Sequence, residues 1–247
     1  MVALNYTSKG DGKPVVLLHP VGLDRTCWSA VAPLLADRRV IAADLRAHGL
    51  SPRDPRSVDV FDYAADVAEL IERIGPCPVV GVSFGGMVTT ALAISRPDLV
   101  TAALISACPS TIPEAGRPVL RARGERPMAE GMESVLAETM DRWFSPGFDA
   151  AHYRQHLLGL DPADWNTGWQ TIANLDLTAR LVDITCPVQL IHAEHDKGTS
   201  LEAMQATASG LRDVRLDVIA GAPHMVHIEQ PDAFAALVNA HIDRAGA

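Results

Sequence analysis

The stretch that decides the fold is an apolar run followed by a glycine-flanked serine and small residues, Pro78-Val79-Val80-Gly81-Val82-Ser83-Phe84-Gly85-Gly86. Residues 81–85 match the pattern G-x-S-x-G. A strand that ends in this pattern and leads into a helix predicts a nucleophile elbow, a turn so tight that the positions on either side need almost no side chain. The turn would expose the Ser83 hydroxyl at a helix N-terminus, where developing negative charge is stabilised. We therefore expect Ser83 to be a catalytic nucleophile.

The chain has the length and composition of an ordinary globular enzyme. Its 247 residues suit one large α/β domain or a core with an insertion, and 48% of them are hydrophobic. The formal net charge of −9 argues against nucleic acid as a partner. No apolar stretch is long enough to span a membrane, and residues 1–6 lack the features of a signal peptide. We therefore expect a cytoplasmic protein without a membrane partner.

The cysteines argue against metal or redox chemistry. Their spacing matches neither a metal site nor a C-x-x-C motif, since they are scattered over the chain as Cys27, Cys77, Cys108 and Cys186. We expect buried, reduced thiols and no metal site, and catalysis by a serine nucleophile needs no cofactor. The sequence does not indicate an oligomeric state.

Strand-like runs alternate with helical patterns along most of the chain, which predicts an α/β fold with a mostly parallel sheet and helices on both faces. The predicted strands cover residues 2–7, 14–19, 39–43, 78–82, 100–106, 187–192 and 214–219. The predicted helices cover residues 26–36, with Thr26 as N-cap, residues 60–74, the segment after Ser83, and residues 200–209 and 231–242.

Residues 108–181 interrupt this alternation. They contain no strand-like run and are rich in Pro, Arg and helix formers, so we expect a helical cap insertion between two parts of a core domain, residues 1–107 and 182–247. The insertion carries half of the chain's aromatic side chains: Trp143, Phe144, Phe148, Tyr153, Trp165 and Trp169. Aromatic residues above a sheet favour an apolar substrate pocket, although they could equally attach the insertion to the core.

A serine nucleophile needs a base, and the base needs an orienting carboxylate. In hydrolases with this elbow, both come from loops after later strands. The last such loop offers two histidines, His224 and His227. The candidate carboxylates are Asp196 and its rivals Glu194, Asp183 and Asp217.

Over nearly its whole length, the chain resembles the α/β-hydrolase-fold enzymes. The matching pieces are residues 17–22 and 44–51, the elbow, the loop ending at Asp196, and His224 followed by Glu229 and Pro231. The resemblance implies a triad of Ser83, Asp196 and His224. It selects His224 over His227 because the family has Glu five residues and Pro seven residues after its histidine. A serine at the elbow implies an acyl-enzyme.

An oxyanion hole requires two N–H groups directed at the tetrahedral oxygen. One should belong to Phe84, the residue after the nucleophile, and the resemblance implies that the other belongs to Val21. Pro20 stands where the family commonly has glycine, but the donor is one residue further on. We expect His19 to order this loop by hydrogen bonding and Arg46 and His48 to have similar structural tasks; the alternative for these two is that they line the pocket.

Within the insertion, the chain resembles 3-oxoadipate enol-lactonases in the order and spacing of its motifs, among them residues 142–148 and Asp161-Pro162. This implies a serine esterase or lactonase that opens a small lactone or ester, with a substrate that can carry a carboxylate. The predicted pocket residues are Trp143, Trp165, Trp169 and Arg123. Arg123 belongs to a cluster of cationic residues with Arg117, Arg121 and Arg126, any one of which could bind a carboxylate but is more simply explained as part of a solvated basic face of a cap helix. The two tryptophans 165 and 169 stand where the enol-lactonases have a tyrosine-centred stretch.

Three other functions remain open at this level. A cofactor-free perhydrolase or haloperoxidase-like enzyme and a C–C bond hydrolase would use the same triad. A non-catalytic small-ligand receptor that kept the fold would bind without turnover. Metal-free bromination with peroxide would reveal the first, and failure to react with a serine-directed phosphonate would favour the receptor.

Overall fold

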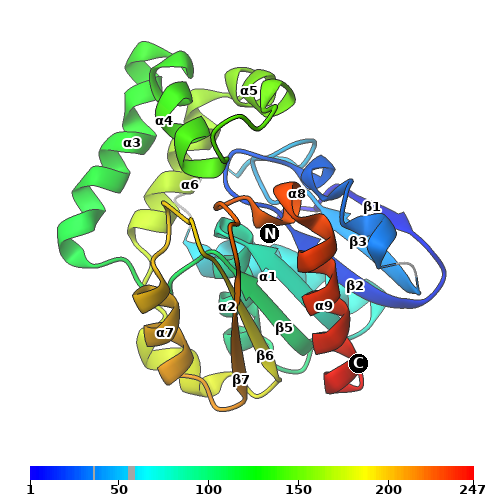
Figure 1. Cartoon of the computed structure of the whole chain (residues 1–247). Coiled ribbons are helices and arrows are strands. Elements are labelled where there is room, and N and C mark those ends of the chain that lie inside the picture. Colours follow the sequence, from blue (N-terminus) through cyan, green and yellow to red (C-terminus); the bar gives the residue numbers. More distant parts are fainter. Residues whose placement is uncertain (36, 55–58) are drawn as a thin grey trace.

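The computed structural model describes residues 1–35, 37–54 and 59–247. In these residues, seven strands form one sheet in the order β1-β3-β2-β4-β5-β6-β7 (Figure 1). β1 pairs antiparallel with β3, and the other neighbours pair in parallel. The strands are β1 (Tyr6–Lys9), β2 (Lys13–Leu18), β3 (Arg38–Ala43), β4 (Cys77–Val82), β5 (Val100–Ser106), β6 (Val188–Ala193) and β7 (Val214–Ile219).

Helices cover both faces of the sheet. In Figure 1, α9 (Pro231–Ala245) lies in front of the sheet, and α1 (Val60–Ile74) and α2 (Phe84–Ser95) lie behind it. Two shorter helices, α7 (Leu201–Ser209) and α8 (Val226–Glu229), follow β6 and β7 in the chain. The central strands are buried on both sides, as Leu17, Val80 and Leu104 illustrate, each at most 1% exposed. The predicted fold class is confirmed, since the sheet is mostly parallel and covered on both faces.

Four helices gather at one end of the sheet (Figure 1): α3 (Arg117–Glu130), α4 (Glu133–Trp143), α5 (Ala151–Leu158) and α6 (Pro162–Ala173). The chain leaves the sheet for these helices after β5 and returns before β6. Its two ends run side by side, since Ile112 N donates to the Leu175 carbonyl at 3.0 Å and Leu177 N donates to that of Ser110 at 2.8 Å. The segment is therefore a single excursion from the sheet.

The prediction of an α-helix over residues 26–36 is wrong. Two short 3₁₀ helices stand there instead, η1 (Arg25–Trp28) and η2 (Ala32–Leu34), and Ala36 lies outside the described residues. The carboxylate of Asp24 accepts from Thr26 N, so Asp24 rather than Thr26 is the N-cap. Pro33 has no N–H with which to continue an α-helix, which accounts for the break. Two further 3₁₀ turns are η3 (Glu114–Gly116) and η4 (Thr178–Asp183).

The agreement of bounds is better in the core. α1, β5 and β7 have the bounds that the periodicity predicts. The prediction of the first strand, over residues 2–7, is wrong by several residues. Pairing with β3 fixes β1 at Tyr6–Lys9, whereas the Val2 N–H donates to Asp66.

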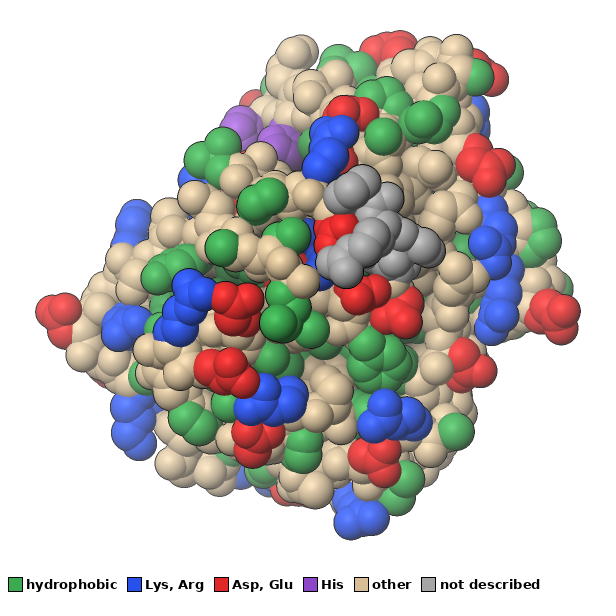
Figure 2. All heavy atoms as spheres, turned by 180° about the vertical axis from the view of Figure 1, so that it is seen from behind, with side chains coloured by type: hydrophobic (Ala, Val, Ile, Leu, Met, Phe, Trp, Pro, Cys, Tyr) green, Lys and Arg blue, Asp and Glu red, His purple; other side chains and the backbone are tan. Residues whose placement is uncertain are grey.

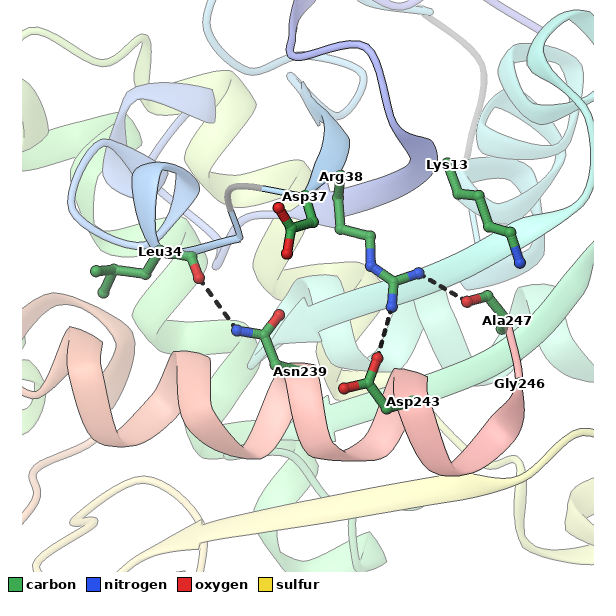
Figure 3. Close-up of a pocket in the computed structure, with 8 residues that line it drawn as sticks. All are labelled: Lys13, Leu34, Asp37, Arg38, Asn239, Asp243, Gly246 and Ala247. Atoms are coloured by element: carbon green, nitrogen blue, oxygen red, sulfur yellow. Dashed lines mark hydrogen bonds and ion pairs between the residues drawn. The ribbon is translucent and has the colours of Figure 1, made fainter.

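A cavity of about 660 Å³ lies at the amino ends of β2 and β3, the edge of the sheet opposite Ser83. Figure 3 shows that Arg38 reaches from β3 to α9, where it contacts the Asp243 carboxylate at 2.9 Å and the Ala247 carbonyl at 2.7 Å. The cavity therefore adjoins a contact between the sheet and α9, and it is separate from the carboxyl ends of the strands.

The surface is charged with both signs interspersed. On the face shown in Figure 2, acidic and basic side chains alternate. Ion pairs at the surface include that of Arg96 with Glu72 and Asp98. Among the helices that the structure describes, none has the length and apolar character that crossing a bilayer requires.

Candidate active site

The chain turns sharply between β4 and α2 at Ser83. Its φ of 54° and ψ of −117° are unusual for a residue with a side chain. A Cβ at Gly81 would lie 2.2 Å from the Gly85 carbonyl oxygen, and one at Gly85 would lie 2.1 Å from that of Leu18. These contacts explain why both flanking positions are glycine. Ser83 N donates to the Ser106 carbonyl at 2.8 Å, which fixes the turn to β5.

A histidine and a carboxylate meet at the same edge of the sheet. Asp196 follows β6 and His224 follows β7, and His224 Nδ1 lies 2.8 Å from Asp196 Oδ1. The Asp196 side chain is fully buried, and that of His224 is 6% exposed. An ionised Asp196 is an acceptor, so it assigns the proton to Nδ1 and leaves Nε2 free to accept one.

Two main-chain donors hold the carboxylate. Gly198 N at 2.6 Å and Thr199 N at 3.0 Å both donate to Asp196 Oδ1. Burial raises the pKa of Asp196, but the adjacent His224 and these two hydrogen bonds outweigh it, so the pKa lies below its usual value. Asp196 is therefore ionised at neutral pH, as a group that orients a histidine must be.

The rival residues have other partners. Glu194 accepts from Gly221 N at 2.7 Å, Asp217 from Gln189, and Asp183 from Arg180. Both ring nitrogens of His227 are buried and have no hydrogen-bond partner among the described residues. Burial lowers the pKa of His227 to about 3, so this ring is neutral.

The loop after β2 is arranged around His19. The His19 ring lies between the Pro20 carbonyl, 2.8 Å from Nδ1, and Leu45 N, which donates to Nε2 at 2.9 Å. Burial lowers the pKa of His19 to about 4, so the ring is neutral and takes no part as an acid. The C=O and N–H groups of a trans peptide point in opposite directions. The Pro20 carbonyl points toward the His19 ring, so the N–H of the same peptide, which belongs to Val21, points away from the ring.

The N–H groups of Val21 and Phe84 have no hydrogen-bond acceptor within residues 1–35, 37–54 and 59–247. Phe84 is the first residue of α2, where helix N–H groups have no partner inside the helix. Both N–H groups are thus available to an oxyanion. Pro20, the departure from the family pattern, supplies the anchored carbonyl and loses no needed donor.

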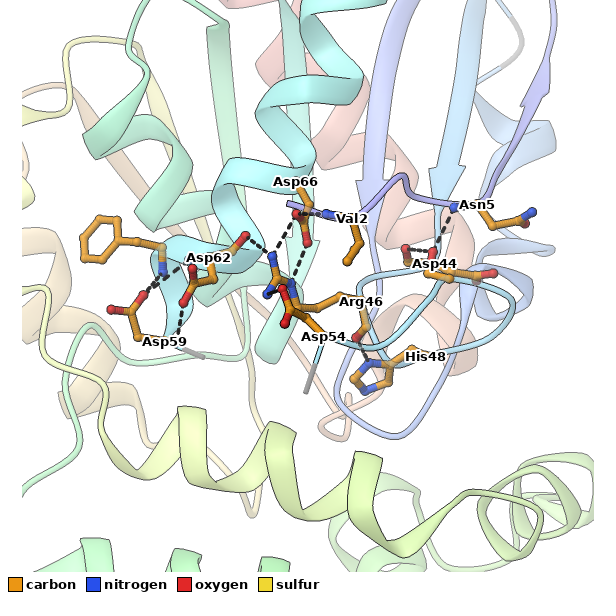
Figure 4. A network of polar contacts seen from close by, with 11 residues as sticks. Val2, Asn5, Asp44, Arg46, His48, Asp54, Asp59, Asp62 and Asp66 are labelled. Atoms are coloured by element: carbon orange, nitrogen blue, oxygen red, sulfur yellow. Dashed lines mark hydrogen bonds and ion pairs between the residues drawn. The ribbon is translucent and has the colours of Figure 1, made fainter. Parts of the chain in front are cut away.

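Arg46 and His48 belong to the loop after β3, and their contacts are structural (Figure 4). Arg46 contacts the Asp66 carboxylate at 2.6 and 2.8 Å, and this ion pair is buried. His48 Nδ1 lies 2.9 Å from the Arg46 carbonyl, and burial lowers the pKa of His48 to about 3. The Arg46–Asp66 pair thus attaches the loop to α1, as we expect from the sequence.

Of the predicted pocket residues, two tryptophans lie against the loop that carries Val21. A Cβ at Gly22 would be 2.8 Å from the Trp165 ring and 3.4 Å from the Trp143 ring. Gly22 has a φ of 76°, so this approach and the backbone both favour glycine. At Gly168, a Cβ would meet Val21 Cγ2 at 2.6 Å. α6 is therefore packed directly on the loop with the candidate oxyanion donor.

Arg123 and Trp169 pair with each other instead. The Arg123 guanidinium lies 4.8 Å from the Trp169 ring centroid and contacts Glu138 at 3.0 Å and Thr139 at 2.8 Å. Trp165 Nε1 donates to the Arg123 carbonyl at 3.1 Å. These contacts join α3, α4 and α6, so they favour a structural task for Arg123.

The other three cationic residues of the cluster also have partners: Arg117 donates to the Ile112 carbonyl, Arg121 contacts Gln170 and Asn174, and Arg126 pairs with Glu138. Sequence reasoning missed the two amides that hold Asp196. The signal was present, since Asp196 followed by Gly198 is a common start of an Asx turn.

Among the described residues, no group of three or more His, Cys, Asp or Glu side chains could hold a metal ion.

A glycine-framed serine, a buried His–Asp pair and two unengaged N–H groups at the carboxyl edge of one sheet define a class, the hydrolase-like α/β enzymes. Comparison with known proteins agrees. The model of the alpha/beta hydrolase family matches residues 15–237, and the chain belongs to this family.

Several of its relatives are named as hydrolases or lactonases. The chain is 28% identical to 2-(acetamidomethylene)succinate hydrolase of Mesorhizobium japonicum, over 98% of this chain and 92% of that one. It is 26% identical to 3-oxoadipate enol-lactonase 1 of Acinetobacter baylyi, over 89% and 85%. The solved enol-lactonase of Burkholderia xenovorans superposes with a TM-score of 0.92 at 23% identity, covering 98% of this chain and 97% of that one, which shows the common fold. The predicted family and enzyme class are confirmed.

Proposed function

We propose that this protein is a serine hydrolase that opens a small lactone or ester through an acyl-enzyme, with Ser83, His224 and Asp196 as its triad. The observation that carries the proposal is the 2.8 Å contact between His224 Nδ1 and the buried Asp196, at the same edge of the sheet as a serine held at a φ of 54°. A structural histidine needs no buried carboxylate with a lowered pKa, whereas a general base next to a strained serine does.

The mechanism follows from these positions. His224 Nε2 takes the proton of Ser83 as Oγ bonds to the carbonyl carbon of the substrate. The carbonyl oxygen becomes an oxyanion that accepts from Phe84 N and Val21 N. The C–O bond to the leaving oxygen then breaks, and His224 gives its proton to that oxygen. Water, deprotonated by the same ring, attacks the acyl-enzyme, and the released acid leaves Ser83 protonated again.

A carboxylate on the substrate is part of the proposal. The named substrate of the Mesorhizobium relative is a succinate, and the Acinetobacter relative is named for an adipate enol-lactone, so both are carboxylic acids. In this chain, we propose that residues 108–181 act as a cap that closes the pocket. Trp143 and Trp165 would form its apolar wall, since both rings lie against Gly22, next to the oxyanion donor.

Labelling with a fluorophosphonate tests the triad. The pure protein would be incubated with the probe and the adduct located by mass spectrometry, with Ser83→Ala and His224→Ala beside it. His227→Phe is the matched control, because it removes the rival imidazole three residues after His224, in α8. We expect an adduct on Ser83 that needs His224 and does not need His227.

The substrate is tested separately, with lactones and esters of equal size that carry or lack a carboxylate. A preference for the anionic compounds supports the proposal, and equal kcat/KM values contradict its carboxylate part. A folded protein that takes no label contradicts the triad and favours a receptor that binds without turnover.

A further inference from the structure

One short segment of the inserted helices contacts three parts of the candidate active site, namely the loops that carry Val21, Asp196 and His224. This segment, Asp141–Ser145, is the end of α4 and the turn after it, and we call it the α4 end. Its Trp143 carbonyl accepts from Met225 N at 3.0 Å, and Met225 directly follows His224. Its Ser145 N donates to Glu229 Oε1 at 2.7 Å. Two hydrogen bonds therefore join the α4 end to the chain after His224.

The other two loops touch the same segment. Arg142 Nη1 donates to the carbonyl of Lys197, the residue after Asp196, at 3.3 Å. The Trp143 ring lies close to Gly22 in the loop that carries Val21. Lys197 Nζ also contacts the Asp141 carboxylate at 2.6 Å, but both side chains are exposed, so this ion pair contributes little. The hydrogen bond from Ser145 N to Glu229 is partly buried and uses a carboxylate, which strengthens it.

The chain directly after His224 forms one hydrogen-bonded turn. The Met225 carbonyl accepts from Ile228 N at 2.9 Å and from Glu229 N at 3.2 Å, which closes the turn of α8. The bonds made by Met225 and Glu229 therefore hold the two ends of a single helical turn. A turn fixed at both ends leaves His224, the residue before it, little freedom to swing away from Ser83.

We propose that Glu229 is a positioning residue: by accepting from Ser145 N, it fixes α8 to the α4 end and so holds His224 in place. This inference rests on the proposed function, in which His224 is the base. It also means that the end of α4 does not lift from the sheet during turnover without carrying the base with it.

The test uses Glu229→Ala and Glu229→Gln in the full chain. The Gln amide oxygen can still accept from Ser145 N, whereas Ala cannot. The control is Asp232→Ala, which removes a nearby carboxylate in the first turn of α9. The measurement is the rate constant of fluorophosphonate labelling at Ser83 as a function of pH, together with kcat, KM and Tm.

We expect Glu229→Ala to label on the order of 10- to 100-fold more slowly, because a catalytic group misplaced by about 1 Å costs that much. The pH midpoint of labelling should move and kcat should fall more than KM changes. Glu229→Gln should recover most of the rate, and Asp232→Ala should keep the wild-type values.

Two results would overturn the inference. One is a Glu229→Ala protein with the wild-type rate and pH profile. The other is a Glu229→Gln protein that is folded, as judged by its Tm, and as slow as Glu229→Ala, since the hydrogen bond would then not be the cause. Failure of the proposed function looks different, because the wild-type protein itself would then take no label on Ser83.

Discussion

Gly85→Ala is the sharpest test of how the elbow is packed. The new Cβ would lie 2.1 Å from the Leu18 carbonyl oxygen, 2.5 Å from its carbon and 2.8 Å from the His19 carbonyl oxygen. These atoms are main chain, and Leu18 pairs with Ala43 on one side and Gly81 on the other. Neither strand can yield easily, so the backbone after Leu18 has to move.

The cost can be estimated from that contact. Overpacking of a core costs about 1–3 kcal/mol, and a clash with paired strands belongs at the upper end, about 3 kcal/mol. For a chain of this size, we expect the Tm to fall by roughly 6–12 °C. The moved backbone leads to Val21, so one oxyanion donor should be lost, with a drop in kcat on the order of 10²- to 10³-fold.

Gly116→Ala is the matched control. Its φ is −84° and the nearest atom to its Cβ would be Ile112 Cγ2 at 3.8 Å, so the change should keep or slightly raise the Tm. Thermal unfolding by circular dichroism and the labelling rate at Ser83 measure both effects. If Gly85→Ala unfolds at the same temperature as Gly116→Ala and labels at the wild-type rate, the close approach of β2 to the elbow is refuted.

Three further outcomes follow from the same geometry. Asp196→Asn should lower kcat on the order of 10⁴-fold, measured by steady-state kinetics, because the charge that orients the His224 ring is lost; near-normal turnover would rule out Asp196. Gly198→Ala, whose Cβ would lie 2.9 Å from His224 Nδ1, should lower the labelling rate by roughly tenfold or more with little change in Tm; an unchanged rate would show that the pair tolerates the methyl group. The buried ring of His227 has a pKa of about 3 in the folded protein against 6.5 when exposed, so the free energy of unfolding should decrease as the pH drops below about 6.5. Urea unfolding of His227→Phe should show a smaller decrease over the same pH range, with labelling of Ser83 unchanged.

The elbow could be predicted from sequence because its determinants are local. The apolar strand, the two glycines and the following helix lie within about twenty residues, and α1, β5 and β7 likewise show clear periodicity. The contact between His224 and Asp196 could be predicted by resemblance, since both follow strands of one sheet edge. The resemblance also selected His224, and the buried, unpartnered ring of His227 agrees with that selection.

Other features depended on contacts that no local pattern contains. The segment expected as a helix from Thr26 contains Pro33, and the cap of Asp24 with that proline produces two 3₁₀ turns instead. Arg123 is one of several basic residues in a polar helix, and nothing in its neighbourhood in the sequence distinguishes it. Its burial results from Trp169 and Glu138, which are supplied by two other helices.

The two adjacent ends of the segment between β5 and β6 have a consequence for how such proteins diversify. Because Ser110 and Ile112 lie beside Leu177 and Leu175, an exchanged segment of another length would meet the sheet at the same two points. Substrate range could thus change by replacement of one block, without redesign of the sheet. A replacement segment would need one main-chain carbonyl that accepts from Met225 N and one main-chain N–H that donates to the Glu229 carboxylate. Replacement of this segment therefore depends on two hydrogen bonds that lie far in the sequence from the two points at which the segment leaves and rejoins the sheet.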